Sequence, residues 1–384
     1  MFMAEWLTAN EAIERLGVRA QTLYAYVSRG RIEARTDAAD PRKSLYSAED
    51  VARLQQRKAR GRKPALVAED AIAWGEPVLA SAITTIRDGR LYYRGRDATV
   101  LARSWSLESV ARLLRGGHGA ALKQRAASVI PDAPSARARA FLALAARAAG
   151  DAPARGRAPL ALAAEAAELL DVLADAVAGE AGEGAIHVRL ARAWNAGEAG
   201  AEQIRATLVL LADHELNAST FAARVTASTG AALAASALAG LSALSGPLHG
   251  GIAPRVEAFI AEAGRVGAEA AVSARLAQGL LIPGFGHPLY PGGDPRARAM
   301  LAAFTPPPAF EAVRAAAETL TGQIANVDYA LTALVAALAL PKDAALLLFA
   351  IARCAGWLAH ALEQLQTGQL IRPRARYIGP EPIG

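Results

Sequence analysis

The sequence predicts a mainly α-helical protein, and three observations support that prediction. Hydrophobic residues make up 53% of the 384 residues and aromatic residues only 5%, so the core must consist mostly of small and aliphatic side chains. Alanine, the strongest helix former and a poor strand former, is abundant in nearly every segment. Beyond residue 97 helical patterns alternate with Pro- and Gly-rich loops, without βαβ alternation or a repeat of solenoid period.

The length predicts two or three domains, at roughly 150 residues each. Cys354 is the one cysteine, which excludes a disulfide scaffold or a cysteine-based metal site and is typical of a reducing cytosol. The first residues lack the succession of a signal peptide. The uncharged stretch 225–248 is interrupted by glycines and a proline, so we expect a buried helix there rather than a membrane span. These features predict a cytoplasmic protein without a membrane partner.

Positive charge is concentrated at the N-terminal end. Residues 1–64 hold 13 Lys/Arg and eight Asp/Glu, a net charge of +5 out of +6 for the whole chain, and the densest run is 57–64. A basic end joined to a nearly neutral body is typical of a nucleic-acid-binding module attached to another domain. A solvated basic linker is the alternative interpretation.

The first 60 residues carry the signals of a small module. Thr8-Ala-Asn-Glu11 predicts a capping box whose helix ends at Gly17, and a second helix follows Val18 and ends at Gly30. Residues 32–46 indicate a hairpin with a turn at 37–41, and Ser47-Ala-Glu-Asp50 predicts the start of a third helix. The apolar residues expected to form the shared core are Ala12, Leu16, Val18, Leu23 and Val27.

This order of elements resembles the winged helix-turn-helix of MerR- and excisionase-type DNA-binding proteins. The resemblance implies that residues 1–64 bind DNA, with polar side chains of the second helix facing base edges and phosphates. Those side chains are Arg19, Gln21, Thr22, Tyr24 and Arg29. A module that contacts protein or serves as a spacer is the alternative.

The body of the chain begins with a hairpin signal and contains two unusual histidines. Residues 81–97 hold two β-rich runs around an Asp88-Gly89 turn. His249 and His287 lie in the turns Gly246-Pro-Leu-His-Gly-Gly and Pro283-Gly-Phe-Gly-His, where glycines allow a ligand close approach. The two histidines are 38 residues apart and lack a nearby ligand partner, so the pattern does not support a metal site. The sequence contains neither a Walker loop nor a GxGxxG motif after a predicted strand, so it does not indicate a nucleotide-binding site.

From about residue 75 to 380 the chain resembles citrate synthase. The resemblance implies the two-domain, mainly α fold of that family: a large domain of residues 75–249 and 340–384 and a small domain of residues 250–339. Residues 1–58 would form the helix-turn-helix module, and 59–74 a basic linker. The motifs follow the family's order: Ser81–Asp97, Asp213–Val225, Gly246–Gly251, Gly284–His287 with Asp294–Arg296, Asn326–Asp328, Arg353–His360 and Ile371–Pro373.

The family's reaction condenses an acyl-CoA with oxaloacetate and then hydrolyses the thioester. A carboxylate must remove a proton from the thioester's α-carbon, and donors must hold the enol and polarise the keto group. The resemblance implies that Asp328 is the base, that His249 is the donor to the thioester oxygen, and that His287 is the donor to the oxaloacetate carbonyl. We expect His249 to act as a neutral electrophile at a helix N-terminus.

The remaining implied roles concern substrate binding. His214 would bind oxaloacetate, and Arg296, Arg353 and Arg372 would bind carboxylates, Arg372 from the neighbouring subunit of a homodimer. The resemblance implies no cofactor beyond the acyl-CoA substrate and no metal. Domain closure would complete the site and exclude water.

Three departures from the family pattern affect CoA recognition and helix packing rather than the acid–base set. Ile252-Ala253 follows Gly251 where the family has Ala-Asn, Pro291 replaces a basic residue, and Tyr329-Ala-Leu follows Asp328 in place of Phe-Tyr-Ser.

Three functions are open for this chain. They are synthesis of citrate or 2-methylcitrate, DNA-binding regulation by a domain that senses a CoA thioester or citrate, and cleavage of citryl-CoA or a related thioester. Synthesis is the preferred prediction, because every implied catalytic side chain is present.

Overall fold

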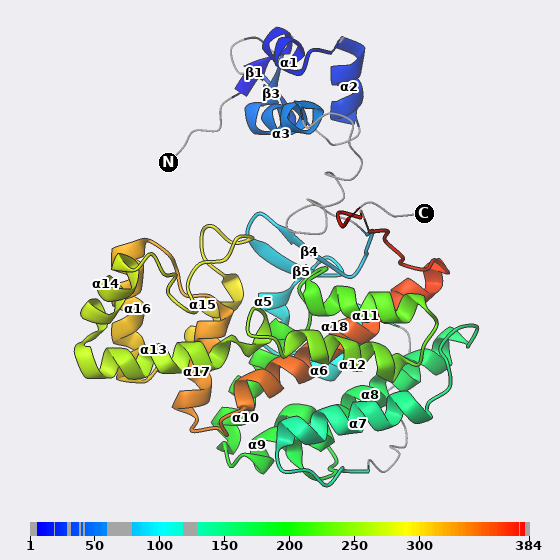
Figure 1. Ribbon diagram of the computed structural model, residues 1–384, viewed down its shortest axis with the longest axis vertical. Helices are drawn as coiled ribbons and strands as arrows, with labels where there is room; N and C mark the ends of the chain where they lie inside the picture. The colour runs from blue at the N-terminus through cyan, green and yellow to red at the C-terminus, as the bar shows by residue number, and fades with distance from the viewer. Residues whose placement is uncertain are drawn as a thin grey trace. The chain divides into compact units, whose positions relative to one another are not determined.

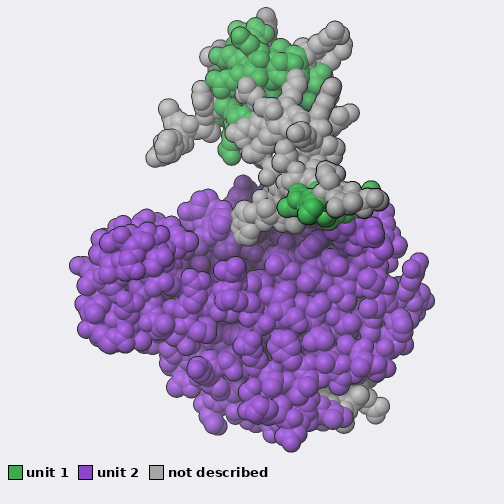
Figure 2. All heavy atoms as spheres, in the orientation of Figure 1, with its two compact units in different colours: residues 1–80, 374–384 green, residues 81–373 purple. Residues whose placement is uncertain are grey.

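The computed structural model describes residues 6–18, 20–28, 32–37, 40, 43–59, 79–117, 129–375 and 377–380 (Figure 1). It contains two compact units, Met1–Ala80 with Arg374–Gly384 and Ser81–Pro373, which Figure 2 colours separately. Helices predominate, and the strands form two three-stranded sheets. The predicted mainly α fold is confirmed. Of the predicted linker 59–74, all but residue 59 lies outside the described residues.

The N-terminal unit is a small α/β module. Strand β3 lies between β1 and β2 and pairs antiparallel with both. The β2–β3 pair confirms the predicted hairpin, whereas β1 was not predicted because three residues are too few for a pattern of period two. The elements are β1 (Trp6–Thr8), α1 (Ala9–Leu16), α2 (Ala20–Ser28), β2 (Ala34–Thr36), β3 (Ser44–Ser47) and α3 (Ala48–Ala59).

Local sequence explains the helix ends of this unit. Thr8 and Glu11 form the predicted capping box, and Gly17 ends α1 in the left-handed conformation at φ 56°. Ser47 caps α3 by accepting the N–H of Asp50 at 3.3 Å. The Asp50 carboxylate instead accepts the N–H of Glu33 at 2.8 Å, which ties α3 to the hairpin. All five predicted core residues lie in or against one hydrophobic cluster.

The body begins with the predicted hairpin, formed by β4 (Thr84–Arg87) and β5 (Arg90–Tyr93). Asp88 and Gly89 have φ values of 52° and 68°, as a type I′ turn requires. A second turn leads to β6 (Arg96–Asp97), which pairs with β5 and extends the hairpin to three strands.

The rest of the body is helical (Figure 1). The helices up to residue 244 are α5 (Ala98–Leu101), α6 (Leu107–Leu114), α7 (Ala136–Gly150), α8 (Pro159–Ala178), α9 (Ile186–Ala193), α10 (Gly197–Leu211), α11 (Ala218–Ser228) and α12 (Leu233–Leu244). Those that follow are η1 (Gly250–Ile252), α13 (Ala253–Val266), α14 (Ala268–Ala277), α15 (Pro295–Leu301), α16 (Pro308–Thr321), α17 (Val327–Ala337) and α18 (Ala344–Thr367). The stretch 225–248 forms parts of two helices rather than the one predicted, because the chain turns at Gly230 (φ 84°).

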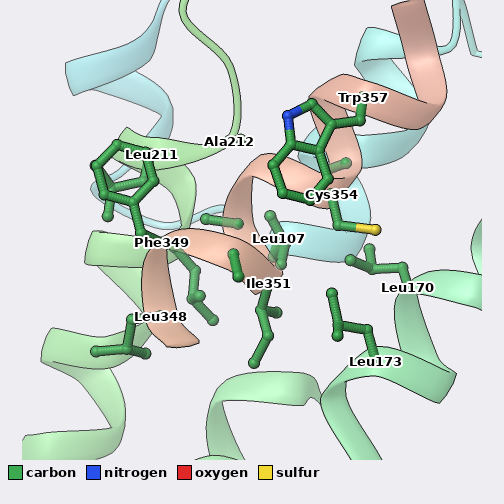
Figure 3. Close-up of a cluster of buried hydrophobic side chains, with 14 of the residues drawn as sticks. Leu107, Leu170, Leu173, Leu211, Ala212, Leu348, Phe349, Ile351, Cys354 and Trp357 are labelled. Carbon is green, nitrogen blue, oxygen red and sulfur yellow. The ribbon is translucent and has the colours of Figure 1, made fainter. Parts of the chain in front are cut away.

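Helix α18 lies at the centre of the large hydrophobic cluster. Trp357, Cys354 and Phe349 of α18 belong to this cluster together with Leu170 and Leu173 of α8 and Leu211 of α10 (Figure 3). By length and composition α18 could cross a membrane, but 94% of its most apolar window is buried inside the protein. The burial of both polar and apolar faces indicates the central helix of an all-α core.

A second hydrophobic cluster lies among α13, α14, α16 and α17. Helix α17 borders both clusters: Leu331 and Leu334 pack into the large one, and Tyr329 and Ala333 into the small one. A side chain on the first turn of α17 therefore lies where the two clusters meet.

Candidate active site

His214 lies in the short connection between α10 and α11. The Tyr93 hydroxyl donates to the carbonyls of Val209 and Leu210 at 3.0 and 3.1 Å, which holds the end of α10 against β5. The Glu215 carboxylate accepts the N–H of Ile86 at 2.8 Å. The hairpin therefore fixes this connection from both sides, and His214 is buried.

His249 ends the turn before η1. A Cβ on Gly251 would lie 2.8 Å from the carbonyl oxygen of Ser245, so the turn requires glycine there. His249 Nε2 lies 2.9 Å from Ser219 Oγ, and Trp357 donates its indole N–H to the same oxygen at 3.1 Å. The Ser219 proton can go to Nε2 or to Asn217 Oδ1, which lies 2.7 Å away.

His287 lies in the second glycine turn, which packs on α17. Gly284 has φ 85°, and a Cβ there would lie 2.9 Å from the Cβ of Tyr329. The N–H of Gly286 donates to the carbonyl of Ile324 at 2.9 Å. The N–H of Leu289 donates to His287 Nδ1 at 3.2 Å, so the neutral ring carries its proton on Nε2.

Asp328 lies on the first turn of α17, where the two clusters meet. Asn326 caps the helix by accepting the N–H of Asp328 at 3.0 Å, and its own amide donates to the carbonyl of Gly286 at 3.0 Å. Within the described part of the chain the Asp328 carboxylate has no hydrogen-bond partner. Burial raises its pKa to about 6, an effect that Arg296 opposes and Asp294 reinforces. An unpaired carboxyl of raised pKa is suited to take up a proton.

Arg296 is buried at the start of α15. Its Nε and one terminal nitrogen donate to the two oxygens of Asp294 at 3.0 and 2.8 Å. Asp294 also caps α15 through the Arg296 N–H and accepts the N–H of Val327 at 3.3 Å. This one carboxylate therefore positions both the arginine and the start of α17.

Arg353 lies in the middle of α18 and is equally buried. Its Nε donates to the carbonyl of Leu211 at 3.0 Å, and its guanidinium carbon lies 4.8 Å from the ring centre of Phe349. Its terminal nitrogens have no partner among the residues that the structure describes. Burial lowers the pKa of Arg353 to about 10, so the group is a desolvated cation at neutral pH.

These groups converge. The ring centres of His214 and His287 lie 5.3 Å apart. Burial lowers the pKa of His214 well below its ordinary value, and both arginines and the other two histidines lower it further. Burial lowers the pKa of His249 and of His287 to about 4, assisted by Arg353 and Arg296 respectively. The prediction of a neutral His249 is consistent with this value, but burial is its main cause rather than the helix N-terminus, since η1 separates His249 from α13.

The remaining predicted residues belong to other parts of the chain. Arg372 is exposed after α18, and its role in a partner subunit stays a prediction. In the N-terminal unit, Tyr24 is 57% exposed and Thr22 half-buried on α2. Arg19, Arg29 and the side chain of Gln21 lie outside the described residues. The described residues contain no cluster of three or more His, Cys, Asp or Glu suited to a metal ion.

Sequence reasoning missed five residues that support the site: Ser219, Tyr290, Asp294, Asn326 and Trp357. All five lie within or beside the motifs that carried the family resemblance. Asp294 and Asn326 are N-caps of α15 and α17, which the local sequence could have indicated. The contacts of Ser219, Tyr290 and Trp357 join segments far apart in the chain, so a local pattern does not identify them. A cavity of about 390 Å³ against α13 and α17 contains none of the predicted site residues. We take the convergent polar groups rather than this cavity as the site, because the cavity lining is mostly apolar.

The fold and this site define a helical enzyme architecture with a pair of buried arginines around neutral histidines and one carboxyl. The sequence model of the citrate synthase C-terminal domain matches residues 121–374, well over half of the chain, so the chain belongs to the citrate synthase family. A helix-turn-helix domain model matches residues 6–59.

Individual relatives agree with this assignment. The chain is 38% identical over 191 residues to citrate synthase 2 of Bacillus subtilis, across 47% of this chain and 51% of that protein. It is 36% identical over 186 residues to 2-methylcitrate synthase 2 of Corynebacterium glutamicum, across 46% and 49%. The chain spans about half the length of the curated relatives it matches. The crystal structure of citrate synthase from Thermotoga maritima superposes with a TM-score of 0.66 and 25% identity, covering 81% of this chain and 96% of that one.

Proposed function

We propose that the protein condenses acetyl-CoA or propionyl-CoA with oxaloacetate, forming citrate or 2-methylcitrate and CoA. The observation that carries this proposal is the Asp328 carboxyl of pKa about 6 beside two neutral imidazoles and two buried arginines. A base of that pKa is mostly ionised at pH 7 and yet retains proton affinity. The reaction needs no cofactor beyond the acyl-CoA.

In this mechanism Asp328 removes a proton from the α-carbon of the thioester. His249 donates its Nδ1–H to the thioester oxygen and stabilises the enol. Nδ1 carries the proton when Nε2 accepts the hydroxyl proton of Ser219. His287 donates its Nε2–H to the keto oxygen of oxaloacetate, which prepares the carbonyl carbon for attack by the enol. Water then hydrolyses the thioester of the condensed product.

The arginines account for the choice of a dicarboxylate. Arg353 and the terminal nitrogen of Arg296 that does not bond Asp294 offer N–H donors to the substrate carboxylates. His214 adds a neutral donor. Arg372 would bind a carboxylate in the partner subunit of a homodimer.

We further propose that residues 250–339 move as a small domain against the rest of the body. Tyr329, next to Asp328, and Phe285, two residues before His287, belong to the small hydrophobic cluster. Arg353 and Ser219, the partner of His249, lie on α18 and α11, whose apolar residues belong to the large one. Closure would exclude water before the enol forms.

The test is release of free thiol when acetyl-CoA or propionyl-CoA is mixed with oxaloacetate and the purified protein. Asp328→Ala should lower turnover by about 10³-fold, because general base catalysis contributes on that order. Arg147→Ala, in a half-buried ion pair on α7, serves as control and should retain turnover. Absence of turnover by the wild type with both thioesters would exclude the proposed synthase.

A second function is favoured by the N-terminal unit, which would bind duplex DNA while the body senses a CoA thioester or citrate. Its support is the helix-turn-helix match, the charge of +5 on residues 1–64 and the exposed Tyr24 of α2. Phosphate contacts make such binding fall steeply with salt.

The full-length protein should retard a random-sequence duplex at 50 mM salt and lose that binding near 200 mM. The double variant Thr22→Ala/Tyr24→Ala should bind more weakly, whereas Tyr377→Ala, an exposed tyrosine outside the helix-turn-helix, should bind as the wild type does. No retardation at 50 mM salt would contradict DNA binding and leave the synthase proposal unaffected.

A further inference from the structure

Tyr290 lies within the site but takes no part in the proposed chemical steps. It follows His287 by three residues and is only 2% exposed. Its ring centre lies 4.9 Å from that of His287 and 5.6 Å from that of His214. The Arg296 guanidinium carbon lies 5.5 Å from the same ring centre. Tyr290 is thus surrounded by three side chains of the proposed oxaloacetate site.

The phenol and His214 are joined by one hydrogen bond, with 2.9 Å between Tyr290 Oη and His214 Nε2. Burial raises the pKa of the phenol above its ordinary value and lowers the pKa of His214 well below its own, so both groups are neutral at pH 7. A neutral phenol and a neutral imidazole can form this bond in either direction. The direction determines which nitrogen of His214 carries the proton.

When a ligand oxygen lies beside Nδ1 of His214, the surroundings of the phenol select one direction of this hydrogen bond. Oη has no other hydrogen-bond partner among the described residues. If Nε2–H donated to Oη, the buried phenol proton would have no acceptor, which costs about 1–3 kcal/mol. If the phenol donates to Nε2, the imidazole proton lies on Nδ1, which has no protein partner in the described part of the chain, and both groups are satisfied once a ligand oxygen accepts that proton.

We propose that Tyr290 is a positioning residue that holds His214 in the Nδ1–H tautomer, so that this N–H is offered to an oxygen of oxaloacetate. The inference rests on the proposed function, in which His214 binds that substrate. In the other tautomer an unprotonated Nδ1 would present its lone pair to a substrate oxygen, and the contact would be repulsive. Tyr290 therefore acts through His214, and it affects the binding of oxaloacetate rather than the binding of the thioester.

The kinetic test is Tyr290→Phe, which keeps the ring and removes only the hydroxyl. The KM for oxaloacetate should rise about tenfold, as expected for loss of one hydrogen bond at a buried site. The KM for the acyl-CoA and kcat should change less than about twofold. Tyr329→Phe is the matched control, because its buried hydroxyl donates to the carbonyl of Phe310 in the small cluster, and it should leave the KM for oxaloacetate unchanged. Equal rises in both KM values, or no rise, would overturn the proposal.

The physical test does not depend on turnover. Side-chain ¹⁵N chemical shifts of His214, assigned by comparison with His214→Gln, should show a protonated Nδ1 and an unprotonated Nε2 in the wild type with oxaloacetate bound. The Tyr290→Phe variant should shift toward a mixture of tautomers. A protonated Nε2 in the wild type would overturn the inference even if the enzyme is active. A protonated Nδ1 in a protein without turnover would support the tautomer and reject the proposed synthase.

Discussion

The two arginine-bearing regions of the site satisfy a buried positive charge in different ways. At the start of α15, Arg296 is paired with both oxygens of Asp294, and its charge is neutralised within the protein. In the middle of α18, Arg353 donates Nε to the carbonyl of Leu211 and forms no ion pair with any described residue. Both guanidinium groups also lie over an aromatic ring.

The pKa values reflect this difference. Asp294 raises the pKa of Arg296 above its ordinary value against the opposing effect of burial, whereas burial lowers that of Arg353 to about 10. An uncompensated buried cation costs free energy of folding, and a bound carboxylate recovers it. Arg353 is therefore the stronger candidate for substrate charge recognition, while Arg296 is also part of the scaffold.

The largest expected effect comes from replacing each arginine with methionine. Both variants should lose about 10³-fold in kcat/KM for oxaloacetate, because each removes a charged hydrogen-bond donor from a buried site. Arg296→Met should also lower the free energy of unfolding by about 3–5 kcal/mol, because it leaves Asp294 buried and unpaired. Arg353→Met should change it by less than about 1.5 kcal/mol. Urea unfolding measures both, and equal losses of stability would refute the comparison.

Asp294→Asn should sharpen the same contrast with a smaller effect. Arg296 loses its counterion, so we expect the free energy of unfolding to fall by about 2–4 kcal/mol. Asp294 raises the pKa of Asp328 and Arg296 lowers it, so the variant should move the acid limb of activity below pH 6. Asp151→Asn, which breaks a half-buried pair with Arg147, is the control and should leave that limb in place. If the acid limb of the pH–activity profile moves above pH 6, the assigned effect of Asp294 on the pKa of Asp328 is contradicted.

The pH dependence of the wild type follows from the same groups. Asp328 must be ionised to act as a base, so kcat/KM for the acyl-CoA should rise about tenfold per pH unit up to about pH 6 and then level off. His249 and His287 have pKa values of about 4 and stay neutral, so no further limb is expected between pH 6.5 and 8. Measurement of kcat/KM from pH 5 to 8 checks this prediction. A further change in rate near pH 7 would contradict the assignment of both histidines as neutral.

The smallest expected effect concerns the free energy of unfolding, which the buried carboxyl of Asp328 lowers when it is ionised. The pKa of Asp328 is higher in the folded protein than its ordinary value near 4, so folding takes up a proton and stability falls as pH rises from about 4 to about 6. Asp328→Asn cannot ionise and should be more stable by about 1–2 kcal/mol at pH 8. The difference should disappear below pH 4. Lower stability of the variant at pH 8 would show that the carboxylate is stabilised by contacts instead.

Much of the chain's local structure follows from short stretches of sequence. The capping box at Thr8, the Ser47 cap of α3 and the Asp88-Gly89 turn each depend on neighbouring residues, and each forms at the predicted position; the second half of the box predicted at Ser47 is replaced by the bond from Glu33 to Asp50. Where the pattern was uniform it misled: 225–248 contains a turn at Gly230 that hydrophobicity alone does not reveal. The predicted boundaries 250–339 remain a prediction, since α17 packs into both clusters.

The amino-acid sequence by itself determined the fold class and the family, and it predicted the histidines, arginines and aspartate of the proposed site, because these depend on composition and on motifs in a fixed order. Only the tertiary structure decided how each group is held and charged. The phenol of Tyr290 meets His214 from 76 positions away, Ser219 meets His249 from 30, and the pKa of Asp328 depends on burial between two hydrophobic clusters. Desolvation and hydrogen-bond direction are properties of three-dimensional surroundings, so a linear pattern does not contain them.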